Sequence, residues 1–174
     1  AGLPDDHGTL HVVREHPRNP NLLFVGSEYG IYGSFDRGAH WVSLKTNLPT
    51  VPVDDIAIHP RENDLIAGTH GRSIWVLDDI TPLEQLDAKA LDADLHVFDI
   101  RPAIAWRVYH HREFPGHKIF LAKNPPYGAL IHYSLKTKLD EKTKVKITIT
   151  DRDSKLVREL DGKKEAGINR VAWD

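Results

Sequence analysis

The stretch SFDRGAHW, residues 34–41, decides the fold of the first half of the chain. It places Ser34, Asp36, Gly38 and Trp41 at regular spacing directly after an apolar run. Ser and Asp side chains bond nearby backbone groups in tight turns, and glycine adopts positive φ without strain. A tryptophan at the end of such a turn brings a large apolar area that can wedge between sheets. The stretch therefore favours a structural turn over the alternative, in which Asp36 is the carboxylate of an active site.

The stretch belongs to an internal repeat. The tripeptide His-Pro-Arg at residues 16–18 recurs at residues 59–61, each time followed by turn residues and then by an apolar run. In the same alignment Asp36 falls on Asp79. The period is about 43 residues, within the roughly 40–50 residues of a four-stranded propeller blade.

The end of the second copy predicts a change of structure. Thr81 followed by Pro82 predicts a short helix over residues 82–91, with Thr81 as its N-cap. Two blades cannot close a ring of the usual 4–8 blades. We therefore expect most of the propeller to lie upstream of Ala1 in the parent chain, or else to be supplied by another chain.

The octapeptide resembles the Asp box, S-x-D-x-G-x-T-W, of bacterial neuraminidase (BNR) repeats, with His40 in place of the usual Thr. Residues 8–86 as a whole are similar to bacterial sortilin-like, Asp-box propeller proteins. The resemblance implies that Ser34, Asp36, Gly38 and Trp41 are structural and lie away from the substrate face. It identifies an architecture rather than an activity.

The second half has a different pattern. In residues 143–150, Val145, Ile147 and Ile149 alternate with Lys and Thr, as in a sheet with one solvated face. Three stretches resemble the Ig-like module, related to one in flagellar-hook capping proteins, that often follows such propellers: NPPYGALIHYSL (124–135), DRDSKLVREL (151–160) and AGINRVAWD (166–174).

The expected fold is all-β: two C-terminal propeller blades followed by a partial Ig/fibronectin-III-like β-sandwich, which shows five of the usual seven strands. The predicted boundaries are 1–81 for the blades, 82–117 for a short helix and linker, and 118–174 for the sandwich.

Composition excludes several classes of protein. The formal net charge of −2 argues against a general nucleic-acid binder. The chain has no apolar stretch near the roughly 20 residues that span a bilayer. It has no cysteine, which excludes thiolate chemistry and disulfides.

No cofactor and no metal site are predicted. The densest histidine cluster is residues 110–113 with His117, but the spacing lacks a helical ligand pair and favours solvated linker histidines. The adjacent carboxylates Asp54-Asp55 suggest Ca²⁺, yet neighbours on a strand point to opposite faces.

Ligand contacts are expected at the turns that enter the innermost part of each blade. The Gly-rich stretch 68–73 lacks the ending of a phosphate loop. The hypothesis is that His70 and Arg72 line the central funnel, with Glu28 and Tyr29 at the equivalent place in the preceding blade. The alternative, turn residues that only satisfy backbone groups, stays open.

The expected function is non-catalytic: an extracellular or periplasmic bacterial propeller that binds a protein or polysaccharide ligand, with the sandwich as an accessory module. The alternative is a sialidase- or xyloglucanase-like glycoside hydrolase with most catalytic residues in upstream blades. That enzyme would need a carboxylate pair flanking the scissile bond.

Overall fold

The computed structural model describes residues 2–44, 46–105, 117 and 122–174. The chain divides into two compact units, Ala1–Leu91 and Asp92–Asp174. Both are built from small antiparallel sheets, so the fold is all-β, as the sequence predicted. Residues 110–113 of the histidine cluster and residues 118–121 at the start of the predicted sandwich lie outside the described residues.

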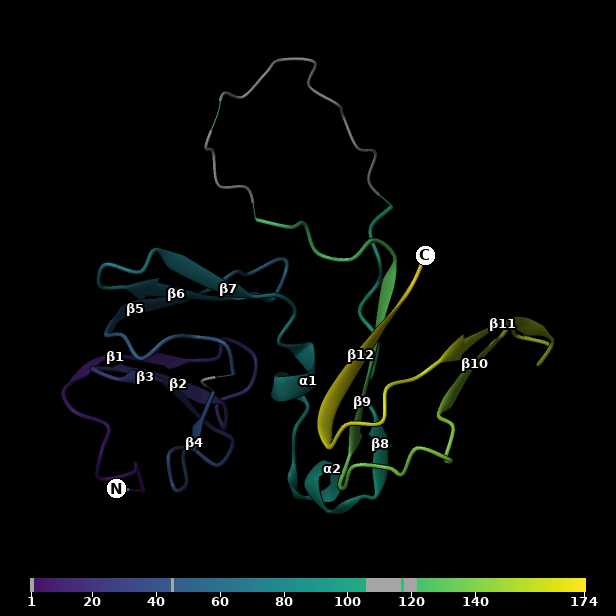
Figure 1. Ribbon diagram of the computed structural model, residues 1–174, viewed down its shortest axis with the longest axis horizontal. Helices are drawn as coiled ribbons and strands as arrows, with labels where there is room; N and C mark the ends of the chain where they lie inside the picture. Colours follow the sequence, from purple (N-terminus) through teal and green to yellow (C-terminus); the bar gives the residue numbers. More distant parts are fainter. Residues whose placement is uncertain (1, 45, 106–116, 118–121) are drawn as a thin grey trace. The chain divides into compact units, whose positions relative to one another are not determined.

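The first unit contains two sheets, which form two layers in Figure 1. Each sheet is a meander in which neighbouring strands are joined by short turns. The first sheet has four strands and the second has three. The strands are β1 (Leu10–Glu15), β2 (Leu23–Ser27), β3 (Gly30–Ser34) and β4 (Val42–Ser43), then β5 (Val53–Ile58), β6 (Leu65–Thr69) and β7 (Ile74–Leu77).

The core of the first unit is built from the facing sides of the two sheets. Phe24 on β2 and Val53 and Ile56 on β5 are completely buried. Gly26 lets the sheets approach closely, because a Cβ there would lie 2.5 Å from the Val53 carbonyl oxygen. Removing the Phe24 side chain would cost about 3–5 kcal/mol at a site this well packed. The cluster comprises Leu22, Phe24, Ile31, Leu48, Val51, Val53, Ile56, Leu65, Ala67 and Ile80.

The helix predicted over residues 82–91 is wrong as a single element. The structure has two short helices, α1 (Thr81–Glu84) and α2 (Ala88–Asp92). The predicted N-cap is also wrong, since Ile80 precedes α1 and no side chain caps it. The Thr81 hydroxyl instead donates to Asp79 Oδ1 at 2.5 Å. Asp87 interrupts the helical run, because its carboxylate accepts the Ala90 N–H at 2.7 Å and so starts a new turn.

The second unit contains a three-stranded sheet and a two-stranded ribbon. The sheet has the order β12-β9-β8, and its edge strand β8 comes from the segment 82–117, for which the sequence predicted a short helix and linker. Tyr133 anchors a nearby loop, since its hydroxyl donates to the Lys163 carbonyl at 2.6 Å. The strands are β8 (Leu95–Val97), β9 (Ala129–Leu135), β10 (Lys146–Thr150), β11 (Leu156–Asp161) and β12 (Gly167–Trp173).

The alternation predicted for residues 143–150 is confirmed on β10. Ile147 and Ile149 are half-buried, while the Lys and Thr side chains between them are exposed. The Asp151 carboxylate closes the hairpin to β11 by accepting the N–H groups of Asp153 and Lys155, both at 2.9 Å.

Candidate functional site

The octapeptide that follows β3 forms a turn held by its own side chains. The Ser34 hydroxyl donates to Asp36 Oδ1 at 2.9 Å and accepts the Gly38 N–H at 2.7 Å. Asp36 Oδ1 also accepts the backbone N–H of His40 at 2.8 Å. Gly38 has a φ of 88°, a conformation that favours glycine. The serine, aspartate and glycine of the motif therefore meet in one turn.

Two further contacts complete this turn. The Trp41 indole N–H donates to the Gly38 carbonyl at 3.0 Å. The His40 ring donates from Nδ1 to Asp36 Oδ2 at 2.6 Å, so histidine supplies a side-chain contact where the motif usually has threonine.

The same contacts set the charge of Asp36. The backbone N–H of His40, followed by its ring, lowers the pKa of Asp36 to about 2. A carboxyl group that stays ionised to this pH is a poor proton donor. Asp36 is therefore suited to holding the turn and not to acting as a general acid.

The two His-Pro-Arg turns repeat a second arrangement. His16 Nδ1 accepts the N–H groups of Arg18 and Asn19, both at 3.3 Å, and His59 Nδ1 accepts the Glu62 N–H at 3.0 Å. Because Nδ1 of His16 is an acceptor, the proton of the neutral ring lies on Nε2. That N–H donates to Asn63 Oδ1 at 3.0 Å, and both side chains are buried.

Asn63 extends this contact to helix α1. Its amide donates to Thr81 Oγ1 and to Glu84 Oε2, both at 3.1 Å. The Glu84 carboxylate also accepts two hydrogen bonds from the Arg18 guanidinium, from Nε to Oε1 and from Nη2 to Oε2, both at 2.8 Å. The hydrogen bonds from Arg18 lower the pKa of Glu84, and those to Glu84 raise the pKa of Arg18. The network joins both turns to the helix, and sequence inspection missed Asn63 as its centre.

The other end of the two sheets carries the predicted ligand residues. Each sheet has a β-bulge there: one at His11, between Leu10 and Val12, and one at Asp54. The Glu28 N–H donates to the Thr9 carbonyl at 2.8 Å. The matching bond in the second sheet runs from the His70 N–H to the Pro52 carbonyl at 2.9 Å. The two repeats thus build the same local backbone.

Each bulged residue pairs with a residue of the adjacent turn. His11 Nε2 lies 3.1 Å from Glu28 Oε2, and His70 Nδ1 lies 3.3 Å from Asp54 Oδ2. The chemistry is exchanged between the repeats: the first has histidine on the bulge and acid on the turn, and the second has the reverse. Bulges are frequent beside active and binding sites because they redirect a side chain.

The remaining predicted ligand residues lie beside these pairs. Tyr29 is 47% exposed at the tip of the β2–β3 turn. Arg72 is exposed on the β6–β7 turn, and its carbonyl accepts the Trp75 indole N–H at 2.9 Å. Both turns lie at the same end of the unit, since Gly26 and Val53 touch across the sheets just inside them. We call this surface the bulge–turn edge, comprising His11, Glu28, Tyr29, Asp54, His70 and Arg72.

Two of these six residues, His11 and Asp54, carry a signal in the sequence. His11 was missed, and Asp54 was considered only as a calcium ligand. The two residues are 43 positions apart, the spacing of the His-Pro-Arg tripeptides. An alignment extended upstream would have matched them. The exchange of histidine and acid conceals the match, because it preserves the pair and not the residue type.

In the described parts of the chain, no group of three or more His, Asp or Glu side chains is placed to hold a metal ion. Within the same residues, no helix has the length and apolar character needed to cross a membrane. His117 is described, but residues 110–113, the rest of its cluster, are not.

Comparisons with models of protein families, with curated proteins and with solved structures find no match to this chain.

Proposed function

We propose that the first unit is a pair of Asp-box propeller blades whose bulge–turn edge binds a protein or glycan ligand without catalysis. The observation that carries this proposal is the repeated bulge. Both sheets have a β-bulge at the same position, and each bulge directs a polar side chain toward an exposed turn. A turn that only satisfied its backbone would not need a matched side-chain pair in both repeats.

The outer face of the second sheet supports the propeller part of the proposal. Ile74 and Val76 on β7 are 68% and 53% exposed, and Ile66 lies beside Val76 on the same face. In the first sheet the outward residues Val25 and Tyr32 are buried. An apolar sheet face of this kind suits packing against another sheet. Further blades from the parent chain are the proposed cover.

The second unit is proposed to be part of an Ig-like sandwich. Its three-stranded sheet and its ribbon with one half-buried face have the antiparallel alternation of sandwich strands. In this proposal the unit is an accessory module of an extracellular or periplasmic bacterial protein.

A glycoside hydrolase is the competing function. A general acid in such an enzyme needs a raised pKa. Asp36, Glu84 and Asp140 have lowered pKa values because they accept hydrogen bonds, which makes them unsuitable for that role. The bulge–turn edge offers two carboxylates, Glu28 and Asp54, each already paired with a histidine.

Binding arrays that carry glycans and peptides, run beside fluorogenic glycosidase assays, test the proposal. We expect a ligand without turnover, and a loss of affinity of about tenfold in His70→Ala and in Arg72→Ala, the size of one lost polar contact. His40→Ala is the matched control for His70→Ala, because both rings are exposed (87% and 80%) and both pair with an aspartate. Arg61→Ala, at the opposite end of the sheet, is the control for Arg72→Ala.

Two results would contradict the proposal. Unchanged affinity in both bulge–turn variants would remove this surface from the binding site. Turnover abolished by Glu28→Gln or Asp54→Asn would replace binding by hydrolysis.

A further inference from the structure

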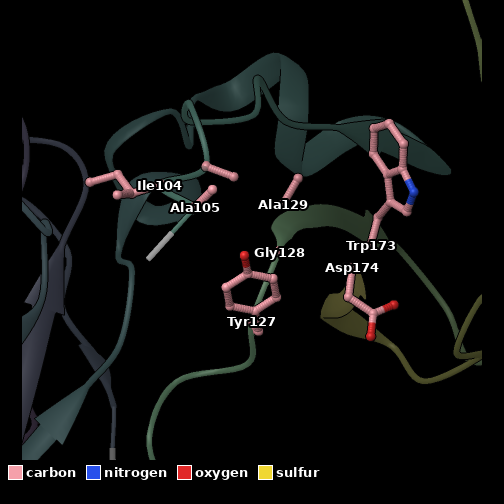
Figure 2. Close-up of a pocket in the computed structure, with 8 residues that line it drawn as sticks. Ile104, Ala105, Tyr127, Gly128, Ala129, Trp173 and Asp174 are labelled. Carbon is pink, nitrogen blue, oxygen red and sulfur yellow. The ribbon is translucent and has the colours of Figure 1, made fainter. Parts of the chain in front are cut away.

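The second unit has a cavity that the proposed function does not use. Its volume is about 300 Å³, at the lower end of the range for small-molecule sites. Ile104 and Ala105 lie on one side of it, and Trp173 and Asp174 lie on the other, with Tyr127 between them (Figure 2). All of these residues belong to the second unit.

Backbone geometry shapes the cavity wall. Gly128 has a φ of 102°, and a Cβ on it would lie 2.1 Å from the Trp173 carbonyl oxygen. This close approach fixes the turn that carries Tyr127 against the end of β12. The ring of Tyr127 and the indole of Trp173 therefore lie beside the same cavity.

The lining chemistry selects a class of ligand. Among the described lining residues, Asp174 carries the one charged side chain, and the other side chains are aromatic or aliphatic. The face of an aromatic ring attracts a cation, and a negatively charged carboxylate attracts the same cation. Alkyl groups on the cation would contact Ile104 and the alanine side chains. Anions would be repelled.

We propose that this cavity binds a small alkylammonium cation with a trimethylammonium group, of which choline is the simplest probe. This proposal rests on the second unit alone and is independent of the bulge–turn edge. The charge and the methyl groups are both required, since the described lining residues offer aromatic rings, aliphatic side chains and one carboxylate side chain.

Choline is titrated into the full chain while ¹H–¹⁵N spectra are recorded. The expected result is saturable shifts of the Trp173 indole N–H and of the Gly128 amide. The matched probe is 3,3-dimethylbutan-1-ol, which has the shape of choline without its charge. At least tenfold weaker binding of this alcohol is expected. Equal binding of the two probes, or no saturable choline shift, would overturn the proposal.

Variants separate the aromatic and electrostatic contributions. Tyr127→Leu is expected to weaken choline binding by about tenfold, as for loss of a cation–π contact, while Tyr127→Phe keeps the ring and the affinity. Asp174→Asn is expected to weaken binding, whereas Asp153→Asn, an exposed acid in the β10–β11 turn, does not. If the ¹H–¹⁵N spectrum of Tyr127→Leu lost its chemical-shift dispersion, the variant would be unfolded, and Trp173→Leu would be tested in its place. Folded variants with unchanged affinity would refute the site.

A second arm identifies the source of the cation. Phosphatidylcholine vesicles are sedimented with the protein in the presence and absence of free choline. Choline shifts without co-sedimentation assign a free cation, and co-sedimentation that choline displaces assigns a lipid headgroup. Both results support the proposal. Vesicle binding that choline leaves unchanged, in a protein that shows no choline shift, would refute it.

Discussion

His11 and Asp54 occupy the same position of two successive repeats, and each is the extra residue of a β-bulge at the start of its sheet. Each side chain lies close to a partner on the neighbouring turn. The distance is 3.1 Å from His11 Nε2 to Glu28 Oε2, and 3.3 Å from Asp54 Oδ2 to His70 Nδ1. The repeats therefore preserve a polar pair while exchanging which partner is the acid. Solvent-accessible ion pairs stabilise proteins weakly, so the repeated pair agrees with the proposed binding surface better than with a role in stability.

The pair of Asp54 and His70 predicts a small effect of Asp54→Asn on stability. The side chains of Asp54 and His70 are 50% and 80% exposed, so solvent screens their attraction. We expect the free energy of unfolding to fall by less than about 0.5 kcal/mol, measured by urea denaturation. A loss above about 2 kcal/mol would show that the pair is structural and would remove it as evidence for a binding surface.

The Asp36 turn predicts a specific dependence of stability on pH. The pKa of Asp36 is about 2 in the folded chain and ordinarily 3.8, so the folded state favours the ionised form. The stabilisation is complete above pH 3.8 and is lost as the pH falls toward 2. We therefore expect Asp36→Asn to lower the melting temperature at neutral pH and to flatten its decline between pH 4 and 2.

Thermal unfolding followed by circular dichroism at a series of pH values measures this effect. Asp5→Asn removes the same charge from an exposed position in the same unit and is the control. An Asp36→Asn variant with the pH profile of the parent chain would contradict the turn interpretation.

The buried network around Asn63 predicts a larger loss of stability. Asn63→Ala would leave the buried His16 Nε2–H without its acceptor and would remove two donors, those to Thr81 and Glu84. An unsatisfied buried group costs about 1–3 kcal/mol, so we expect a loss of about 2–4 kcal/mol in urea denaturation. Asn19→Ala, which removes a half-buried bond to the Glu84 carbonyl and an exposed bond from the Asn21 N–H, leaves no buried group without a partner and should cost about 1 kcal/mol. Equal losses would show that the network has no centre at Asn63.

Local contacts were the part of the structure that sequence could predict. Ser34, Asp36 and Gly38 interact within four positions, so their spacing alone defines the turn. The pair of His11 and Glu28 spans 17 positions and depends on a one-residue bulge, which changes the alternation on which strand prediction relies. The prediction of one helix over residues 82–91 was wrong for a related reason. One side-chain cap, from Asp87, starts a new helical turn inside a segment that propensity treats as continuous.

The outer face of the second sheet gives a prediction about its cover. Ile74→Ala and Ile56→Ala make the same chemical change at positions that are 68% and 0% exposed. In the chain of 174 residues we expect a loss of about 2–5 kcal/mol for Ile56→Ala and of less than about 1 kcal/mol for Ile74→Ala.

In a version of the protein that carries further repeats, a neighbouring blade would bury Ile74, and the loss caused by Ile74→Ala should rise above about 2 kcal/mol. Urea denaturation of both variants in both chains measures the difference. An Ile74→Ala loss that stays below about 1 kcal/mol in the longer protein would mean that no blade packs on this face, and the propeller assignment would have to be abandoned.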